Sequence, residues 1–203
     1  MTHTRSTAGA DGLPDEAVLR RALDAYFTVI ESQGVSSLPD LDRWYQDELP
    51  EKIASREPRH LTLPEMVRLT EWKMARGVWR APNLVLVRGN DEELVRQTSR
   101  SALAKIPHPT APIAELTKLR GVGPATASAA LAAAAPERYP FFDELVAAQL
   151  PGLGDVAWTL GYYARYADTL RDLAAGFGGD WTPARLERAL WAHAGGKAGA
   201  GRK

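Results

Sequence analysis

The spacing of apolar residues predicts helices along nearly the whole chain. Between a proline at Pro14 and a glycine at Gly34, apolar side chains recur every three to four residues, which is the period of one helical face. The same period predicts helices at residues 63–76, 92–105, 124–135, 156–174 and 183–193. Shorter helices are predicted to open at Pro112 and near Asp143. The pattern assigns no helix to the proline-punctuated stretch around Trp44 and Tyr45.

This pattern predicts an all-α fold. Only Leu84–Val87 has a strand-like composition, and one isolated strand cannot form a sheet. A single helical domain is expected over residues 13–194, and a solenoid is not expected, because no internal repeat is visible. Residues 1–12 and 195–203 are small and polar without an apolar period, and they are predicted to be flexible tails.

A glycine turn, Gly121-Val122-Gly123-Pro124, interrupts the helical pattern and predicts a helix-hairpin-helix over residues 113–132. Both glycines permit backbone angles that are closed to other residues, and they leave no side chain between the turn and a ligand. Pro124 suits the first turn of the second helix. The free N–H groups there form an anion site such as a DNA phosphate would occupy. A tight corner between two helices, without a ligand, is the structural alternative.

Charge is distributed unevenly along the chain. The 203 residues carry 25 basic and 25 acidic side chains, and a net charge of zero argues against nucleic acid as a partner. However, residues 1–58 carry 6 basic and 11 acidic groups, residues 59–120 carry 11 and 6, and residues 121–203 carry 8 and 8. The basic middle section would attract DNA to the turn. Candidate phosphate contacts are Lys73, Arg76, Arg80, Lys118 and Arg120, for which solvated helix faces are the alternative.

Composition narrows the classes of protein that the chain can represent. The absence of cysteine excludes disulfides, thiolate zinc sites and cysteine-held iron–sulfur clusters. The four histidines lack ligand-like spacing, so no metal or other cofactor is expected, although a monovalent cation at the hairpin stays open. No run reaches the roughly 20 apolar residues that span a bilayer. A cytoplasmic protein without a membrane partner is expected, associated with the nucleoid if it binds DNA.

Residues 116–127 read Leu-x-x-Leu-x-Gly-Val-Gly-x-x-Thr-Ala, which resembles the hairpin of the helix-hairpin-helix DNA glycosylase superfamily. The resemblance covers residues 63–175 and is specific over 113–146. It implies a glycosylase-like helical bundle, with two lobes around a cleft as one arrangement, and double-stranded DNA as the partner. The residues that would contact the DNA backbone are Lys118, Arg120, Gly121, Val122, Gly123 and Thr126.

The resemblance also implies a catalytic aspartate after the hairpin, at Asp143. A carboxylate there would stabilise the cationic sugar of glycosidic cleavage and orient a water molecule. Bifunctional members carry a nucleophilic lysine where this chain has Ala125, which excludes a Schiff-base lyase mechanism at that position. Glu144-Leu145 also departs from the family pattern. The resemblance therefore implies a monofunctional DNA N-glycosylase, while a helix N-cap is the alternative role of Asp143.

A flipped base would need stacking partners. Phe141, Phe142, Trp72 and Tyr162 are the candidates for such a pocket, since a flipped base is held between aromatic or apolar walls. Core packing is the alternative for each of them. Two further functions stay open: a non-catalytic DNA-binding module that keeps the fold, and a helical protein-interaction domain with an incidental hairpin.

Overall fold

The computed structural model describes residues 12–197, and this part of the chain is mostly helical, without a strand or sheet. The all-α prediction is confirmed. The predicted tails lie outside the described residues except for Gly12 and residues 195–197. Within that short C-terminal stretch, the Gly195 carbonyl accepts a hydrogen bond from Gln33 Nε2 over 2.9 Å, and Lys197 pairs with Glu144.

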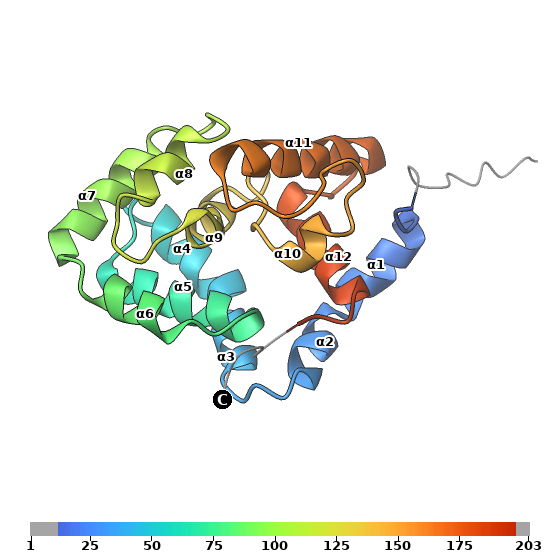
Figure 1. Cartoon of the computed structure of the whole chain (residues 1–203), viewed down its shortest axis with the longest axis horizontal. Coiled ribbons are helices and arrows are strands. Elements are labelled where there is room, and N and C mark those ends of the chain that lie inside the picture. Colours follow the sequence, from blue (N-terminus) through green and yellow to red (C-terminus); the bar gives the residue numbers. More distant parts are fainter. Residues whose placement is uncertain (1–11, 198–203) are drawn as a thin grey trace, which may run out of the picture.

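The described residues contain thirteen helical elements, which are joined by loops (Figure 1). Their bounds are α1 Glu16–Asp24, α2 Tyr26–Ser32, α3 Leu38–Arg43, the π-helix η1 Trp44–Glu48, α4 Leu49–Ala54, α5 Leu63–Arg76, α6 Ala81–Arg88, α7 Glu92–Leu103, α8 Ala111–Leu116, α9 Pro124–Ala134, α10 Glu144–Ala147, α11 Leu160–Phe177 and α12 Pro183–His193.

The N-terminal region differs most from the sequence-based prediction. The single helix predicted from Pro14 to Gly34 is divided at Ala25 into α1 and α2. The stretch for which no helix was predicted is helical from α3 through η1 to α4. Pro39 and Pro50 lie in the first turns of α3 and α4, where a proline's missing N–H removes no helical hydrogen bond.

The middle helices follow the predicted bounds because their ends carry strong capping signals. Thr62 and Glu65 form a capping box at the start of α5, and Gly77 ends that helix. Asp91 caps α7 by accepting a hydrogen bond from the Leu94 N–H over 2.9 Å. The strand-like composition of Leu84–Val87 is misleading, since these residues lie in α6. The two buried residues there, Leu84 and Val87, are three apart, which is helical spacing.

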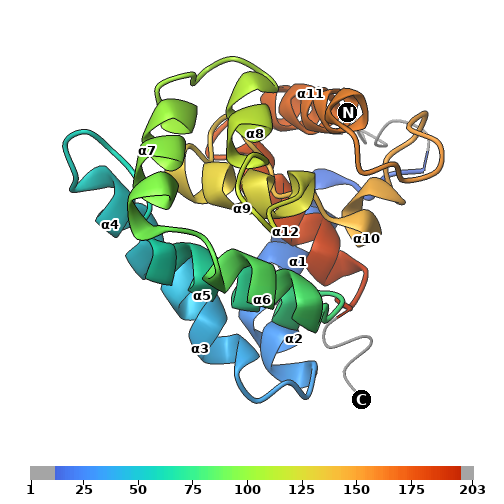
Figure 2. The ribbon, with the colours of Figure 1, turned by 60° about the vertical axis from the view of Figure 1, so that its left-hand side comes forward.

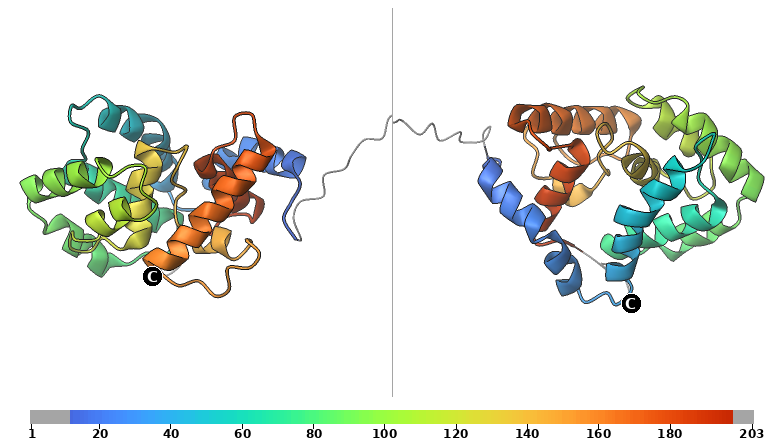
Figure 3. Two further views of the ribbon diagram at one scale, coloured as in Figure 1. Left: turned by 90° about the horizontal axis from the view of Figure 1, so that it is seen from above. Right: turned by 180° about the vertical axis from the view of Figure 1, so that it is seen from behind.

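The helices form two groups with α9 between them. Helices α1, α2, α10, α11 and α12 gather on one side, and helices α4 to α8 on the other (Figures 1 and 2). Figure 3 shows α9 between α8 and the C-terminal helices from above. Residues 125–133 of α9 are all buried and mostly alanine. Small side chains let helix axes approach closely. Both groups of helices therefore pack against α9 and share one continuous hydrophobic core.

Across residues 12–197, no helix has the length and apolar character needed to cross a membrane.

Candidate functional site

The hairpin turn is attached to the junction of α6 and α7 by one side chain. Asn90 Oδ1 accepts a hydrogen bond from the Arg120 N–H over 2.9 Å, and Asn90 Nδ2 donates to the Arg120 carbonyl over 2.9 Å. The same amide donates to the Val87 carbonyl. The N-cap of α7 is Asp91, and the neighbouring Asn90 fixes the position of the turn.

The two glycines of the turn have different structural roles. Gly121 has φ +76°, and a Cβ there would lie 2.5 Å from the Asn83 carbonyl oxygen and 2.9 Å from Leu86 Cβ. Gly123 has φ −95° and ψ 179°, which any residue adopts, and a Cβ would meet nothing within 4 Å. The predicted need for special backbone angles is confirmed at Gly121 and wrong at Gly123. Gly121 is needed for the contact with α6.

The start of α9 faces a cavity of about 270 Å³, which we call the Asp143 cavity. Gly123, Pro124, Ala125 and Thr126 line it, and no side chain caps this helix N-terminus. The positive end of the helix dipole therefore faces the cavity. Val122 does not line it: its side chain is buried, and its N–H donates to the Leu119 carbonyl over 3.2 Å.

Other walls of the Asp143 cavity come from distant parts of the chain. The end of α5 contributes Lys73, and the start of α6 contributes Asn83. The segment before α10 contributes residues 141–143, α10 contributes its first residue, Glu144, and the loop before α11 contributes Trp158. The Trp158 ring is 4.7 Å from the Phe142 ring, and 44% of the residue is exposed. The cavity is therefore partly aromatic and has charged groups on its other walls.

Asp143 both caps a helix and lines the cavity. Its Oδ1 accepts a hydrogen bond from the Leu145 N–H over 2.8 Å, which caps α10. Its Oδ2 lies 3.4 Å from Arg76 Nη1, and only 8% of the residue is exposed. The predicted N-cap is confirmed. The catalytic role stays a prediction, and the two roles are compatible because a fixed carboxylate is a preorganised one.

Arg76 is the centre of a buried ionic cluster. Its guanidinium pairs with Asp143 and, over 2.8 Å, with Glu187 of α12, and its carbon Cζ lies 4.5 Å from the Trp191 ring. Arg76 Nε has no partner within residues 12–197. Burial raises the pKa of Glu187 to about 7 although Arg76 opposes the shift. The predicted phosphate contact at Arg76 is therefore wrong, since this side chain is fully buried.

Lys73 and Arg80 are the two basic residues of the Asp143 cavity. Arg80 is exposed at its edge. Lys73 is partly buried, and no hydrogen bond or ion pair of its amine occurs within the described residues. Burial lowers the pKa of Lys73, and the positive charge of Arg80 lowers it further, against the pull of Asp143 and Glu144. The two basic residues predicted to contact phosphate at the hairpin, Lys118 and Arg120, do not line this cavity. Lys118 pairs with Glu115.

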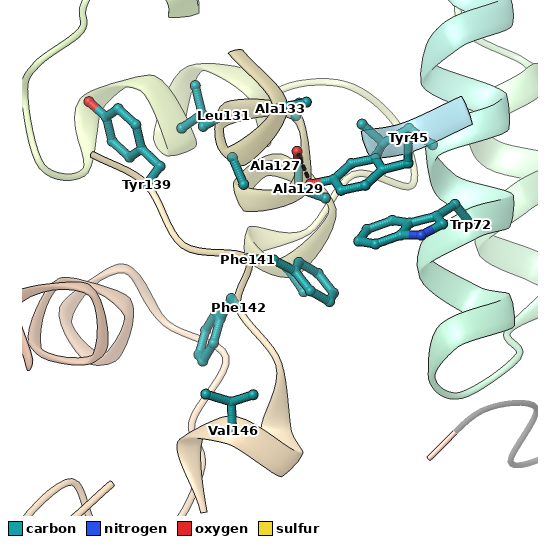
Figure 4. Close-up of a cluster of buried hydrophobic side chains, with 14 of the residues drawn as sticks. Tyr45, Trp72, Ala127, Ala129, Leu131, Ala133, Tyr139, Phe141, Phe142 and Val146 are labelled. Carbon is teal, nitrogen blue, oxygen red and sulfur yellow. Dashed lines mark hydrogen bonds between the residues drawn. The ribbon is translucent and has the colours of Figure 1, made fainter. Parts of the chain in front are cut away.

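The structure brings together half of the predicted base pocket. Phe141 and Phe142 line the Asp143 cavity, but Trp72 and Tyr162 do not. Trp72 is stacked on Tyr45 at 3.5 Å between ring centroids, on the side toward which Phe141 points (Figure 4). Tyr162 is buried and stacks on Phe142, with the two ring centroids 5.7 Å apart.

Trp158 lines the cavity, although the sequence analysis did not name it as a stacking partner and named Trp72 and Tyr162 instead. It lies in a loop that precedes α11, although a helix was predicted from residue 156. No local signal distinguished Trp158, because it lies within the helix that the apolar period predicts over residues 156–174.

Within residues 12–197, no three His, Cys, Asp or Glu side chains gather in a way that could hold a metal ion. The monovalent cation at the hairpin stays a prediction. Comparisons with protein-family models, with curated proteins and with solved structures find no match to this chain.

Proposed function

We propose that this protein binds double-stranded DNA at the 121–126 turn and releases a flipped base in the Asp143 cavity by hydrolysis of its N-glycosidic bond. One observation carries the proposal: Asp143 and the uncapped start of α9 line the same cavity. A DNA phosphate at this helix N-terminus would place the adjacent nucleotide at the cavity that Asp143 lines.

The dimensions and walls of the cavity suit a single base. Its volume of about 270 Å³ is close to the lower limit, about 300 Å³, of ordinary ligand pockets. Phe142 and Trp158 offer stacking surfaces, as a flipped base requires. The two groups of helices on either side of α9 would then correspond to the two lobes of a glycosylase-like bundle.

Asp143 supplies the chemistry in this proposal. Positive charge develops on the sugar as the bond from C1′ to the base breaks, and a nearby carboxylate stabilises that charge. Water adds to C1′, and the departing base takes up a proton. The Leu145 N–H and Arg76 hold the carboxylate in place, so it does not need to reorient during the reaction.

Asp143→Asn is expected to reduce base release at least about 100-fold, because the amide keeps the N-cap but loses the charge. The measurement is base release from a panel of duplexes with alkylated, deaminated and oxidised bases. Glu144→Gln is the matched control, since Glu144 lines the same cavity without the Arg76 contact. Equal activity of wild type and Asp143→Asn, or no release by wild type on any duplex, overturns the catalytic proposal.

A non-catalytic DNA-binding module is the second candidate. The ion pair between Asp143 and Arg76 favours it, because this pair gives the carboxylate a purely structural function. In this case the hairpin still binds DNA, and no base is released by the wild-type protein.

Both candidates predict that Gly123→Val weakens DNA binding about tenfold or more, because the new side chain covers the N–H groups at the start of α9. Affinity of the wild type is expected to fall steeply with added salt. The measurement is titration of a labelled duplex at several salt concentrations. Gly176→Val in α11 is the control, since a Cβ there also meets nothing within 4 Å. Salt-independent binding, or equal affinity of both variants, leaves only a protein-interaction domain.

A further inference from the structure

Lys73 differs from the other lysines that the structure describes. Between residues 12 and 197, each of the others pairs with a glutamate: Lys52, Lys105, Lys118 and Lys197. Lys73 has no such partner, and it lines the Asp143 cavity beside Asp143 and Glu144. A partly buried amine without an ion-pair partner, in a cavity with two carboxylates, is an arrangement suited to a reaction rather than to folding.

The surroundings of Lys73 favour its uncharged form. Removal from water disfavours the ammonium ion, and the nearby guanidinium of Arg80 adds repulsion, so the pKa of Lys73 lies below its ordinary value. An uncharged amine is a nucleophile toward carbonyl carbon. Lysines activated by desolvation and a neighbouring cation form imines with carbonyl substrates.

We infer that Lys73 Nζ forms an imine with the C1′ aldehyde of an abasic deoxyribose, and that the protein cleaves abasic DNA by β-elimination. The inference rests on the proposed function, because base release generates this aldehyde. The chain has Ala125 on the cavity wall where bifunctional glycosylases carry their lysine. Lys73 of α5 places an amine on another wall of the same cavity.

The reaction balances without an oxidant or reductant. Nζ adds to C1′ of the ring-opened sugar, and the adduct loses water to form the imine. Asp143 takes a proton from C2′, a double bond forms between C2′ and C3′, and the C3′–O bond breaks. The leaving group is the phosphate at the 5′ end of the downstream strand. Water then hydrolyses the imine, which releases an unsaturated aldehyde and restores the lysine.

Borohydride trapping tests this inference directly. Full-length protein is mixed with a duplex that already contains an abasic site, and sodium borohydride reduces the imine to a stable covalent adduct. We expect one adduct per protein, mapped to residue 73 by mass spectrometry. Lys73→Gln and Lys73→Arg are expected to reduce the adduct more than tenfold, and Lys52→Gln in α4 is expected to keep it, since Lys52 pairs with Glu48 and does not line the cavity. The arginine variant retains charge and length, so its loss of the adduct reflects the missing amine.

The same duplex separates the inference from the proposed function. It bypasses base release, so trapping at residue 73 supports the lysine chemistry even where base release fails and the hydrolytic proposal falls. Abasic duplex that binds without forming an adduct overturns the lysine inference alone. An adduct at another amine, or an undiminished adduct in Lys73→Arg, also overturns it. Protein that does not bind the duplex overturns both.

Discussion

Gly121→Ala is expected to lower the free energy of unfolding by about 2–5 kcal/mol. About 1–2 kcal/mol comes from a side chain at φ +76°. About 1–3 kcal/mol more comes from overpacking, since the new Cβ would lie 2.5 Å from the Asn83 carbonyl oxygen and 2.9 Å from Val87 Cγ2. Urea denaturation followed by circular dichroism measures the change as a shift of the midpoint.

Gly123→Ala is the matched control two residues away. Its φ of −95° is open to alanine, and the new Cβ meets nothing within 4 Å. Its unfolding midpoint is therefore expected to stay close to that of the wild type. Equal losses of stability in the two variants would contradict the different roles of these glycines.

Arg76→Met is expected to lower the free energy of unfolding by about 3–5 kcal/mol, because it leaves two buried carboxylates without their shared cation. Methionine fills part of the same space, so the loss reflects charge more than volume. The measurement is urea denaturation near neutral pH. Arg80→Met is the control, since Arg80 is exposed, and a similar loss there would contradict the account of the buried cluster.

The pH dependence of stability tests the same cluster. The folded protein holds a proton on Glu187 up to a pKa of about 7, whereas the ordinary value is 4.5. The folded state therefore binds more protons than the unfolded chain in this window, and the free energy of unfolding falls as pH rises from about 4.5 to 7. Glu187→Gln is expected to remove this fall. A wild-type profile that stays level across the window, or an unchanged profile in the variant, would contradict the raised pKa.

Sequence patterns predicted the helices whose ends carry local signals. The prediction for α5 matches the structure because Thr62, Glu65 and Gly77 mark both ends within the sequence itself. The helices from α3 to α4 were missed because Pro39 and Pro50 look like helix breakers, and only the fold shows that both occupy first turns.

The candidate site was predictable where its residues are close in sequence. The hairpin, Phe142 and Asp143 follow one another along the chain and line one cavity. The contribution of α5 depends on how that helix packs against α9, which no local spacing encodes. Trp72 and Lys73 show the difficulty: successive helical residues point about 100° apart, so one lies against Tyr45 and the other lines the cavity.

The Asn90 contacts indicate that the hairpin does not keep its conformation apart from the rest of the fold. Its turn depends on hydrogen bonds from the junction of α6 and α7 and on a glycine contact with α6. Its first helix, α8, has only six residues, far below the length at which an isolated helix is stable in water. A peptide of residues 113–132, or a graft of these residues onto another scaffold, would lack this support. The unit that evolution or protein engineering can transfer therefore begins no later than α6.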